Sequence, residues 1–480
     1  MGNMKAFFFC LTLLLWFVGG GNRDPAVFRS LPNILFVLAD DLAWSDPGYA
    51  GHAWHETPHL DALAASGLVF TDGYAPAPIC AASRASILTG KTTARLGFEF
   101  VTKNEPGSQR IDMATPLKAP SFTLNLSLEE ETMAEILSKQ GYETAYFGKW
   151  HLNAHYKKYL GWSPTHGPAN QGVEVAVEDF GNHPYAWGTE TPQSIEEHGD
   201  FPDDTMVDAV CRFLEQKHER PFFAMASSFY VHTPVRTPCQ WLLEKYGAKI
   251  PKESPNRDKR IAYAAFLETL DHHVGLMLNA LDASGQRENT LVVFTSDNGG
   301  HPEFTANGPL RGSKWNLYEG GIRVPFIVRW PGYTNMRSQS QLPVIGYDLL
   351  PTFVEVAGGD AQDVDGVSLV PHIHDPRRFI DRGLIWHFPY YHPERGYARA
   401  IESIGVNDLD VSKTHPQSAF RRGDMKLVYF YEDERVELFD LRKDVSEQKD
   451  ISGMFPELEK SLTSELMREL RGMNARFPSR

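Results

Sequence analysis

The sequence predicts an α/β protein with a doubly wound, mainly parallel sheet and a small C-terminal subdomain of antiparallel strands and a helix. Continuous apolar runs such as Asn33–Ala39 and Leu291–Thr295 are typical of strands that are buried on both faces. Segments with helical spacing of apolar residues separate these runs, as in parallel sheets with crossover helices. From about Asp375 the runs become short, aromatic and alternating, which indicates a second, antiparallel sheet.

The expected elements divide the chain into a larger domain over residues 32–374 and a subdomain over residues 375–480. In the larger domain the strands are Asn33–Ala39, Leu68–Phe70, Tyr142–Phe147, Pro221–Ala226, Leu291–Thr295 and Val324–Val328. Its helices begin at Pro58, at Cys80, after a capping box of Ser127 and Glu130, near Met206, and at Arg260. The subdomain strands are Leu384–His387, Ser418–Phe420, Lys426–Tyr431 and Val436–Asp440, and Glu457–Leu470 is an amphipathic helix.

Residues 1–21 have the pattern of an export signal. Lys5 supplies a positive charge, Ala6–Val18 is an almost uninterrupted apolar run, and Gly19–Gly21 offers small residues for cleavage. The run is short for a bilayer span, and no later run is long enough for one. We therefore expect an exported protein without a stable membrane anchor.

Composition excludes some classes of partner. The chain has 480 residues, of which 42% are hydrophobic and 22% charged, as in folded globular proteins. Its net charge of -14 argues against nucleic-acid binding, which needs a basic surface. An anionic substrate remains possible, because a local basic pocket can exist in an acidic protein.

Four expected strands are followed by polar side chains. They are Asp40 and Asp41 after the first strand, Lys149 and His151 after Tyr142–Phe147, His232 beyond Pro221–Ala226, and Asp297 and Asn298 after Leu291–Thr295. Ligands of open α/β sheets bind beyond the carboxyl ends of the strands. The sequence therefore predicts one site at this edge, to which Lys314 in a glycine-containing loop is a further candidate.

The acidic members of this set offer only oxygen ligands. Asp40, Asp41, Asp297 and Asn298 suit a hard cation such as Ca²⁺ or Mg²⁺ rather than zinc. Each motif alone is more often a turn or a cap. The matching positions at two strand ends favour a metal site.

Cys80 stands at the expected start of a helix that Gly90 ends. Free backbone N–H groups at a helix N-terminus favour an anion, and Arg84 one turn later adds a positive charge on the same face. Cys211 and Cys239 are candidates for a disulfide, although Cys211 also fits a small core residue. Cys80 has no such structural explanation, which makes it the candidate reactive side chain of an anion pocket.

The segment from Cys80 to Lys91 resembles the signature of the type I sulfatases, C-x-P-x-R followed by T-G. The resemblance extends in order over almost the whole chain after the signal, which makes it specific. The other matching segments are Asn33–Asp41, Gly141–His151, Asp297–Gly300, Gly312–Pro325 and Arg422–Leu427. It implies an alkaline-phosphatase-like α/β catalytic domain over residues 32–374 with a small C-terminal sheet subdomain.

The resemblance also implies the role of each candidate residue. Cys80 would be converted by a modifying enzyme to formylglycine, whose hydrate is the nucleophile, and Arg84 would steady the hydrate. Asp40, Asp41, Asp297 and Asn298 would bind one Ca²⁺ together with the modified Cys80, Mg²⁺ being the less favoured ion. Lys149 and Lys314 would bind the sulfate oxygens, His151 would act as base on the hydrate, and His232 would face the leaving oxygen.

One departure from the signature leaves alternatives open. Ala82 occupies the position of the usual proline, where the modifying enzyme reads the motif. The alternatives are a phosphatase or phosphodiesterase of the same superfamily, which commonly uses Ser or Thr and two zinc ions, and a non-catalytic binder of sulfated glycans.

The expected substrate is a sulfated carbohydrate. His301, Trp315, Asn316 and the run Trp386–Tyr391 are candidates for a sugar subsite, because aromatic rings supply stacking area. The Trp386 run fits equally well a role in packing the subdomain interface. The export signal and the few cysteines favour a bacterial periplasm or secretion over a lysosomal location.

Overall fold

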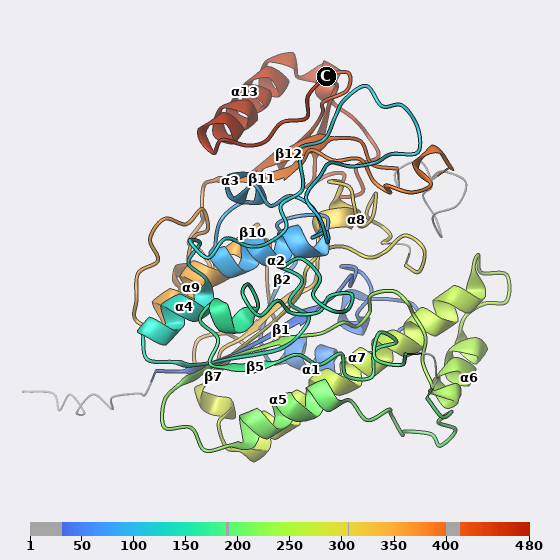
Figure 1. Cartoon of the computed structure of the whole chain (residues 1–480), viewed down its shortest axis with the longest axis vertical. Coiled ribbons are helices and arrows are strands. Elements are labelled where there is room, and N and C mark those ends of the chain that lie inside the picture. Colours follow the sequence, from blue (N-terminus) through green and yellow to red (C-terminus); the bar gives the residue numbers. More distant parts are fainter. Residues whose placement is uncertain (1–30, 189–191, 306, 400–412) are drawn as a thin grey trace, which may run out of the picture. The chain divides into compact units, whose positions relative to one another are not determined.

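An eight-stranded sheet forms the centre of the protein (Figure 1). The computed structural model describes residues 31–188, 192–305, 307–399 and 413–480, and the expected export signal lies outside them. The strand order is β5-β4-β6-β1-β7-β8-β2-β9, and only β8 runs against its neighbours. The strands are β1 Asn33–Ala39, β2 Leu68–Phe70, β4 Glu143–Gly148, β5 Val175–Val177, β6 Phe222–Ser227, β7 Thr290–Ser296, β8 Phe326–Arg329 and β9 Ser338–Ser340.

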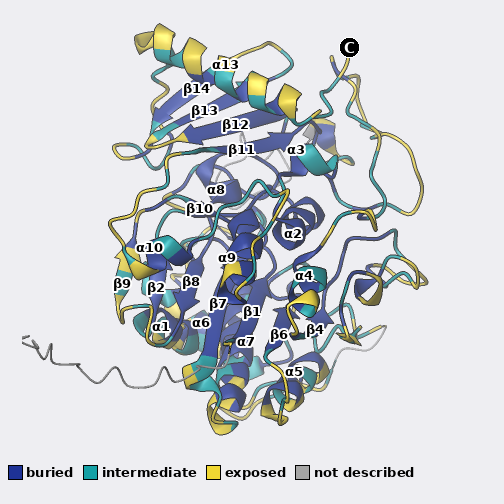
Figure 2. Cartoon of the chain, turned by 90° about the vertical axis from the view of Figure 1, so that its left-hand side faces the viewer, coloured by how far each residue is buried: buried dark blue, intermediate teal, exposed yellow. Residues whose placement is uncertain are grey.

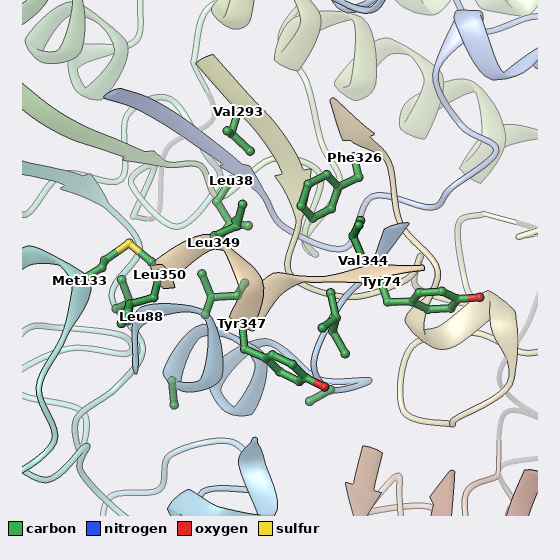
Figure 3. Packing of buried hydrophobic residues seen from close by; sticks show 14 of the residues in the cluster. Leu38, Tyr74, Leu88, Met133, Val293, Phe326, Val344, Tyr347, Leu349 and Leu350 are labelled. Atoms are coloured by element: carbon green, nitrogen blue, oxygen red, sulfur yellow. The ribbon is translucent and has the colours of Figure 1, made fainter. Parts of the chain in front are cut away.

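Helices cover both faces of this sheet, as a doubly wound fold requires (Figure 1). Leu35 and Val37 of β1 pack in the cluster that includes residues of α1, α5 and α7, whereas Phe36 and Leu38 pack in the cluster of α2, α4 and α9. Figure 3 shows part of the second cluster, where Leu38 and Val293 of the sheet lie near Leu349. The predicted mainly parallel α/β fold is therefore confirmed.

The helices include every one that the sequence pattern predicts, some with different ends, and others that it does not predict. Those of the larger domain are α1 Pro58–Ala65, α2 Cys80–Thr89, α3 Thr93–Leu96, α4 Met133–Lys139, α5 Thr205–Glu215, α6 Gln240–Lys249, α7 Arg257–Ala283, α8 Glu319–Ile322, α9 Leu349–Val356 and α10 Val370–His374. Short strands β3 Gly73–Tyr74 and β10 Val344–Ile345 form a separate pair.

The capping box predicted at Ser127 and Glu130 is wrong. The capping box of α4 consists of Thr132 and Glu135. The Thr132 side chain accepts from the backbone N–H of Glu135, and the Glu135 side chain accepts from the backbone N–H of Thr132. Ser127 and Glu130 instead close a turn, in which the N–H of Glu130 donates to the carbonyl of Ser127 at 3.2 Å. Both pairs satisfy the S/T-x-x-E pattern, and the one next to the apolar residues of the helix forms the cap.

A second sheet of four antiparallel strands follows, in the order β11-β12-β13-β14. The strands are β11 Gly383–Phe388, β12 Gln417–Arg422, β13 Met425–Phe430 and β14 Val436–Asp440. Helix α13 Pro456–Gly472 covers the sheet with Leu462, Leu466 and Leu470 and exposes its other side (Figure 2). The boundary near residue 375 stays a prediction.

The Trp386 run packs the protein and does not line a sugar subsite. Trp386 is fully buried, its ring meets that of Tyr74 at 5.2 Å, and its Nε1 donates to the carbonyl of Ala75 at 2.8 Å. The rings of Tyr390 and Tyr391 are also buried. The run therefore joins the second sheet to the segment before α2.

The possible disulfide between Cys211 and Cys239 does not exist. Both are free thiols, and Cys211 packs against the cluster of α5 and α7 as a small core residue. Over the described part of the chain, no helix combines the length and the apolar character needed to cross a membrane.

The turn after β4 depends on a glycine. Gly148 has φ +90°, and a Cβ there would lie 2.4 Å from the carbonyl oxygen of Ser227. Gly141 has φ +88° with no heavy atom within 4 Å of a Cβ. We expect Gly141→Ala to cost about 1–2 kcal/mol for its positive φ, and Gly148→Ala about 1–3 kcal/mol more for overpacking.

Urea unfolding of the two variants measures this difference directly. Equal losses of unfolding free energy would show that the Ser227 carbonyl yields without cost.

Candidate active site

The ends of four parallel strands lie at one level. Gly148 of β4 pairs with Ser227 of β6, Ser227 pairs with Leu38 of β1, and Leu38 pairs with Thr295 of β7. The polar residues that follow these strands are thereby brought to one edge of the sheet, as the sequence predicts. The site is built on strand ends rather than on long loops, which fixes the positions of its side chains.

Cys80 begins α2 and faces this edge. All ten residues of α2 are buried, and the Cys80 side chain is 1% exposed. Its Sγ lies 3.8 Å from Oδ1 of Asp41. Burial raises the pKa of the Cys80 thiol far above its ordinary value, although Lys149 and Lys314 act in the opposite direction. The unmodified side chain is thus a neutral thiol rather than a thiolate.

Arg84 extends from α2 across the strand ends. It is fully buried, and its Nε and Nη2 both lie 2.8 Å from Oδ2 of Asp297. Its Nη1 donates to the carbonyl of Lys149 at 3.0 Å and to the hydroxyl of Ser227. Burial opposes the guanidinium charge, but Asp297 and Asp40 outweigh it and raise the pKa of Arg84. Arg84 therefore links α2 to three strands.

The two predicted lysines pair with the two adjacent aspartates. Nζ of Lys149 donates to Oδ2 of Asp40, and both groups are fully buried. Nζ of Lys314 lies 2.7 Å from each carboxylate oxygen of Asp41. Although burial acts to raise the pKa of Asp41, Lys314, His301 and Lys149 together outweigh it and hold that pKa below its ordinary value.

The acidic residues leave two oxygens for a cation. In the described chain, Oδ1 of Asp40 and Oδ1 of Asn298 are buried without a hydrogen-bond partner. Burial and the nearby Asp40 raise the pKa of Asp297 to about 7, which shows that the acids crowd one another. Potential ligand atoms of Asp40, Asp41, Cys80 and His232 lie within 4.8 Å of one another. The oxygens of Asp40, Asp41 and Asn298 are the ligands that a hard divalent cation prefers, whereas the thiol of an unmodified Cys80 and the ring of His232 are not.

The two predicted histidines reach the same place. Nε2 of His232 lies 3.8 Å from Oδ2 of Asp41, while its Nδ1 donates to the carbonyl of Thr233 at 2.6 Å. His151 is 5% exposed, and its Nδ1 has no hydrogen-bond partner among the described residues. Burial, together with Lys149, lowers the pKa of both histidines well below the ordinary value. Both rings are therefore neutral near pH 7.

Three residues that support the site are not among those predicted from the sequence. The hydroxyl of Ser227 donates to the carbonyl of Lys149 at 2.6 Å, and it could have been suspected as the last residue of its strand. His183 donates from Nε2 to the carbonyl of His232 at 3.0 Å, and the hydroxyl of Tyr185 lies 3.2 Å from Nδ1 of His232. No motif marks these last two.

The other candidates for a sugar subsite lie beside Lys314. The ring of Trp315 meets those of His301 at 4.9 Å and His392 at 4.2 Å. Asn316 is buried, and its Oδ1 accepts from the N–H of Ser313 at 3.4 Å. Asn316 thus supports the Lys314 loop.

This fold and its charged strand-end site define an alkaline-phosphatase-like hydrolase, and the comparisons identify the family. Residues 32–359 match the family described as "Sulfatase", and residues 313–476 match "N-sulphoglucosamine sulphohydrolase, C-terminal". The chain belongs to the sulfatase family, whose members are sulfuric ester hydrolases.

Relatives match along most of their length. A "Sulfatase" of Formosa agariphila is 32% identical over 87% of this chain and 83% of its own. Human "Arylsulfatase A" is 33% identical over 71% of this chain and 67% of its own. The crystal structure of Ps i-CgsB in complex with k-i-k-neocarrahexaose is 25% identical, with a TM-score of 0.70 over 92% of this chain and 93% of that one.

Removing the guanidinium group of Arg84 tests whether this group holds the site together. We expect Arg84→Gln to lower the free energy of unfolding by about 3–5 kcal/mol, because Asp297 remains buried without the guanidinium that pairs with it. The exposed Arg212 on α5 is a matched control, and Arg212→Gln is expected to change stability by less than about 0.5 kcal/mol. Urea unfolding measures both free energies. Near-equal stability of the two variants would show that Arg84 does not hold the site together.

Proposed function

We propose that this sulfatase hydrolyses sulfate esters of carbohydrates through a formylglycine hydrate derived from Cys80, with one Ca²⁺ bound. The observation that carries the proposal is the environment of Cys80. Its side chain is buried at a helix N-terminus, 3.8 Å from Asp41, in the field of Lys149 and Lys314. A site of this kind is suited to an anionic substrate.

The state of Cys80 favours a modified side chain over a thiolate nucleophile. Burial raises the pKa of its thiol, so the unmodified residue has little nucleophilic character. An aldehyde hydrate at this position would supply two hydroxyls on one carbon, one to attack sulfur and one whose deprotonation expels sulfate. Arg84, anchored on Asp297, would steady the hydrate.

The carboxylates would hold the cation. Asp40, Asp41, Asp297 and Asn298 are the proposed ligands, together with the modified Cys80, and the partnerless oxygens of Asp40 and Asn298 support this choice. When bound, Ca²⁺ would offset the negative charge of the sulfate group. Ca²⁺ is preferred to Mg²⁺ because it accepts more protein oxygens in a flexible arrangement.

The lysines and histidines would act on the substrate itself. Lys149 and Lys314, whose Nζ atoms pair with Asp40 and Asp41, would bind sulfate oxygens. His151 is neutral and can take the proton of the hydrate. His232 would face the leaving oxygen through Nε2, because the carbonyl of Thr233 engages its Nδ1.

A carbohydrate substrate is supported by the relatives. Ps i-CgsB was crystallised with the oligosaccharide k-i-k-neocarrahexaose, and this chain aligns with 93% of that structure. We propose the same class of substrate, a sulfated glycan, and export to the periplasm or the medium, where such polymers occur.

Mass spectrometry of the Cys80 peptide tests the nucleophile. We expect a peptide from native protein to carry an aldehyde in place of the thiol, and Cys80→Ala to lose turnover of 4-nitrophenyl sulfate while the protein stays folded. Cys211→Ala is the matched control, because Cys211 packs away from the site on α5 and should keep full activity. An active protein whose Cys80 is entirely unmodified thiol would overturn the proposal.

Thermal unfolding tests the cation site. We expect Ca²⁺ at a hundredfold excess over its dissociation constant to stabilise the protein by about 2.7 kcal/mol, and a chelator to reverse this. Asn298→Ala should weaken the response, because it removes one of the two partnerless oxygens.

Asn153→Ala serves as the control for this experiment. The Oδ1 of Asn153 is also buried without a partner, but its amide nitrogen donates to the carbonyls of Ala154 and Gly161 rather than to Asp41. Equal responses to Ca²⁺ in the two variants, or a larger response to Mg²⁺ in the wild type, would contradict the assignment.

A further inference from the structure

A short loop closes on itself directly after the catalytic candidate His151. In residues 156–161 the N–H of Tyr156 donates to the carbonyl of Gly161 at 3.2 Å, and the N–H of Gly161 donates to the carbonyl of Lys158 at 3.0 Å. The amide of Asn153 fastens the base of the loop on the carbonyl of Gly161. Leu160 is buried and anchors the end of the loop. The loop is therefore a fixed turn rather than a loose connection.

This loop presents an aromatic ring to solvent. Tyr159 is 51% exposed although its ring makes two ring contacts. One contact is with His155 at 4.8 Å, and the other is with Tyr185 at 5.4 Å. The ring is thus held in place from behind while much of its surface stays free.

The second contact connects Tyr159 to the reaction centre. The hydroxyl of Tyr185 lies 3.2 Å from Nδ1 of His232, the residue that would face the leaving oxygen. Burial raises the pKa of the Tyr159 phenol, and the charges of Lys149 and Lys314 act in the opposite direction. A continuous row of rings, His232, Tyr185 and Tyr159, therefore extends from the leaving-group side of the site to the surface.

We propose that Tyr159 and Tyr185 form a subsite that binds the sugar on the leaving-group side of a sulfated oligosaccharide. The proposal rests on the proposed function, which places the leaving oxygen at His232. Sugar rings present apolar C–H faces that pack on aromatic side chains, and a ring fixed in advance loses little entropy on binding.

The charge of the loop indicates that the glycan is anionic. Lys157 is exposed beside Tyr159 and brings a positive charge to a protein with a net charge of -14. Local positive charge attracts a polyanion to an otherwise repelling surface.

The subsite is tested by comparing the activity of one variant on two kinds of substrate. The substrates are 4-nitrophenyl sulfate, whose leaving group is a single ring, and sulfated oligosaccharides prepared from carrageenan, ulvan and chondroitin sulfate. We expect Tyr159→Ala to lower kcat/KM about tenfold for the oligosaccharide that the wild type desulfates, and less than about twofold for 4-nitrophenyl sulfate. Tyr159→Phe keeps the ring and should retain most of the oligosaccharide activity.

Tyr333 provides the matched control. It is 37% exposed, and its ring is held by Trp330 in a stacked contact at 4.0 Å, whereas the neighbours of Tyr159 hold that ring by edge contacts. It follows β8, whose end at Arg329 pairs with Val292 at the start of β7, so it lies at the opposite edge of the sheet from Asp297. Tyr333→Ala should leave both activities unchanged.

The outcomes separate this subsite from the proposed function. A wild-type protein with no sulfatase activity on any of these substrates refutes the proposed function. Equal losses on both substrates in Tyr159→Ala, or none on the oligosaccharide, overturn the subsite while leaving the function intact. Activity of the wild type on 4-nitrophenyl sulfate alone also counts against the subsite.

Discussion

The pairing of Arg84 with Asp297 is the interaction on which the site depends. Both side chains are fully buried, and a buried charge without its partner costs several kcal/mol. Arg84 belongs to α2 and Asp297 to the end of β7, so the pair can form only when the helix lies across the strand ends. The same guanidinium bonds the carbonyl of Lys149 and the hydroxyl of Ser227, and this extends the constraint to β4 and β6.

The remaining charged groups complete a network in which the positive and negative charges nearly balance. Asp40 pairs with Lys149, and Asp41 pairs with Lys314 and accepts from Asn298 at 2.7 Å. Each lysine that would bind the substrate is thus held in the protein by a carboxylate that would bind the cation. An anionic ligand that enters the site must compete with these carboxylates for the lysines, and a cation bound by the carboxylates would reduce that competition.

The sequence predicted the parts of this site that follow from chain direction. Parallel strands end at one edge, so Asp40, Lys149 and Asp297 were expected to meet, and the register confirms it. Partners that depend on three-dimensional packing could not be read in this way. The support of His232 by Tyr185 joins positions 47 residues apart, and neither residue belongs to a pattern. The wrong capping box at Ser127 and the burial of Trp386 are similar cases, because a local pattern fits two environments and the tertiary structure selects one.

The complete burial of α2 has a consequence for the order in which the protein matures. An enzyme that modified Cys80, as proposed above, would have to enclose it and its neighbours in its own active site, yet this side chain is 1% exposed and Ala82 is 0% exposed. Extracting α2 from the folded core would require breaking the Arg84 network and much of the hydrophobic cluster above the sheet. Any conversion of Cys80 must therefore take place while the segment is still unfolded. Folding of the core would then bury Cys80 in the form it has reached. A chain that folded before modification would keep the thiol.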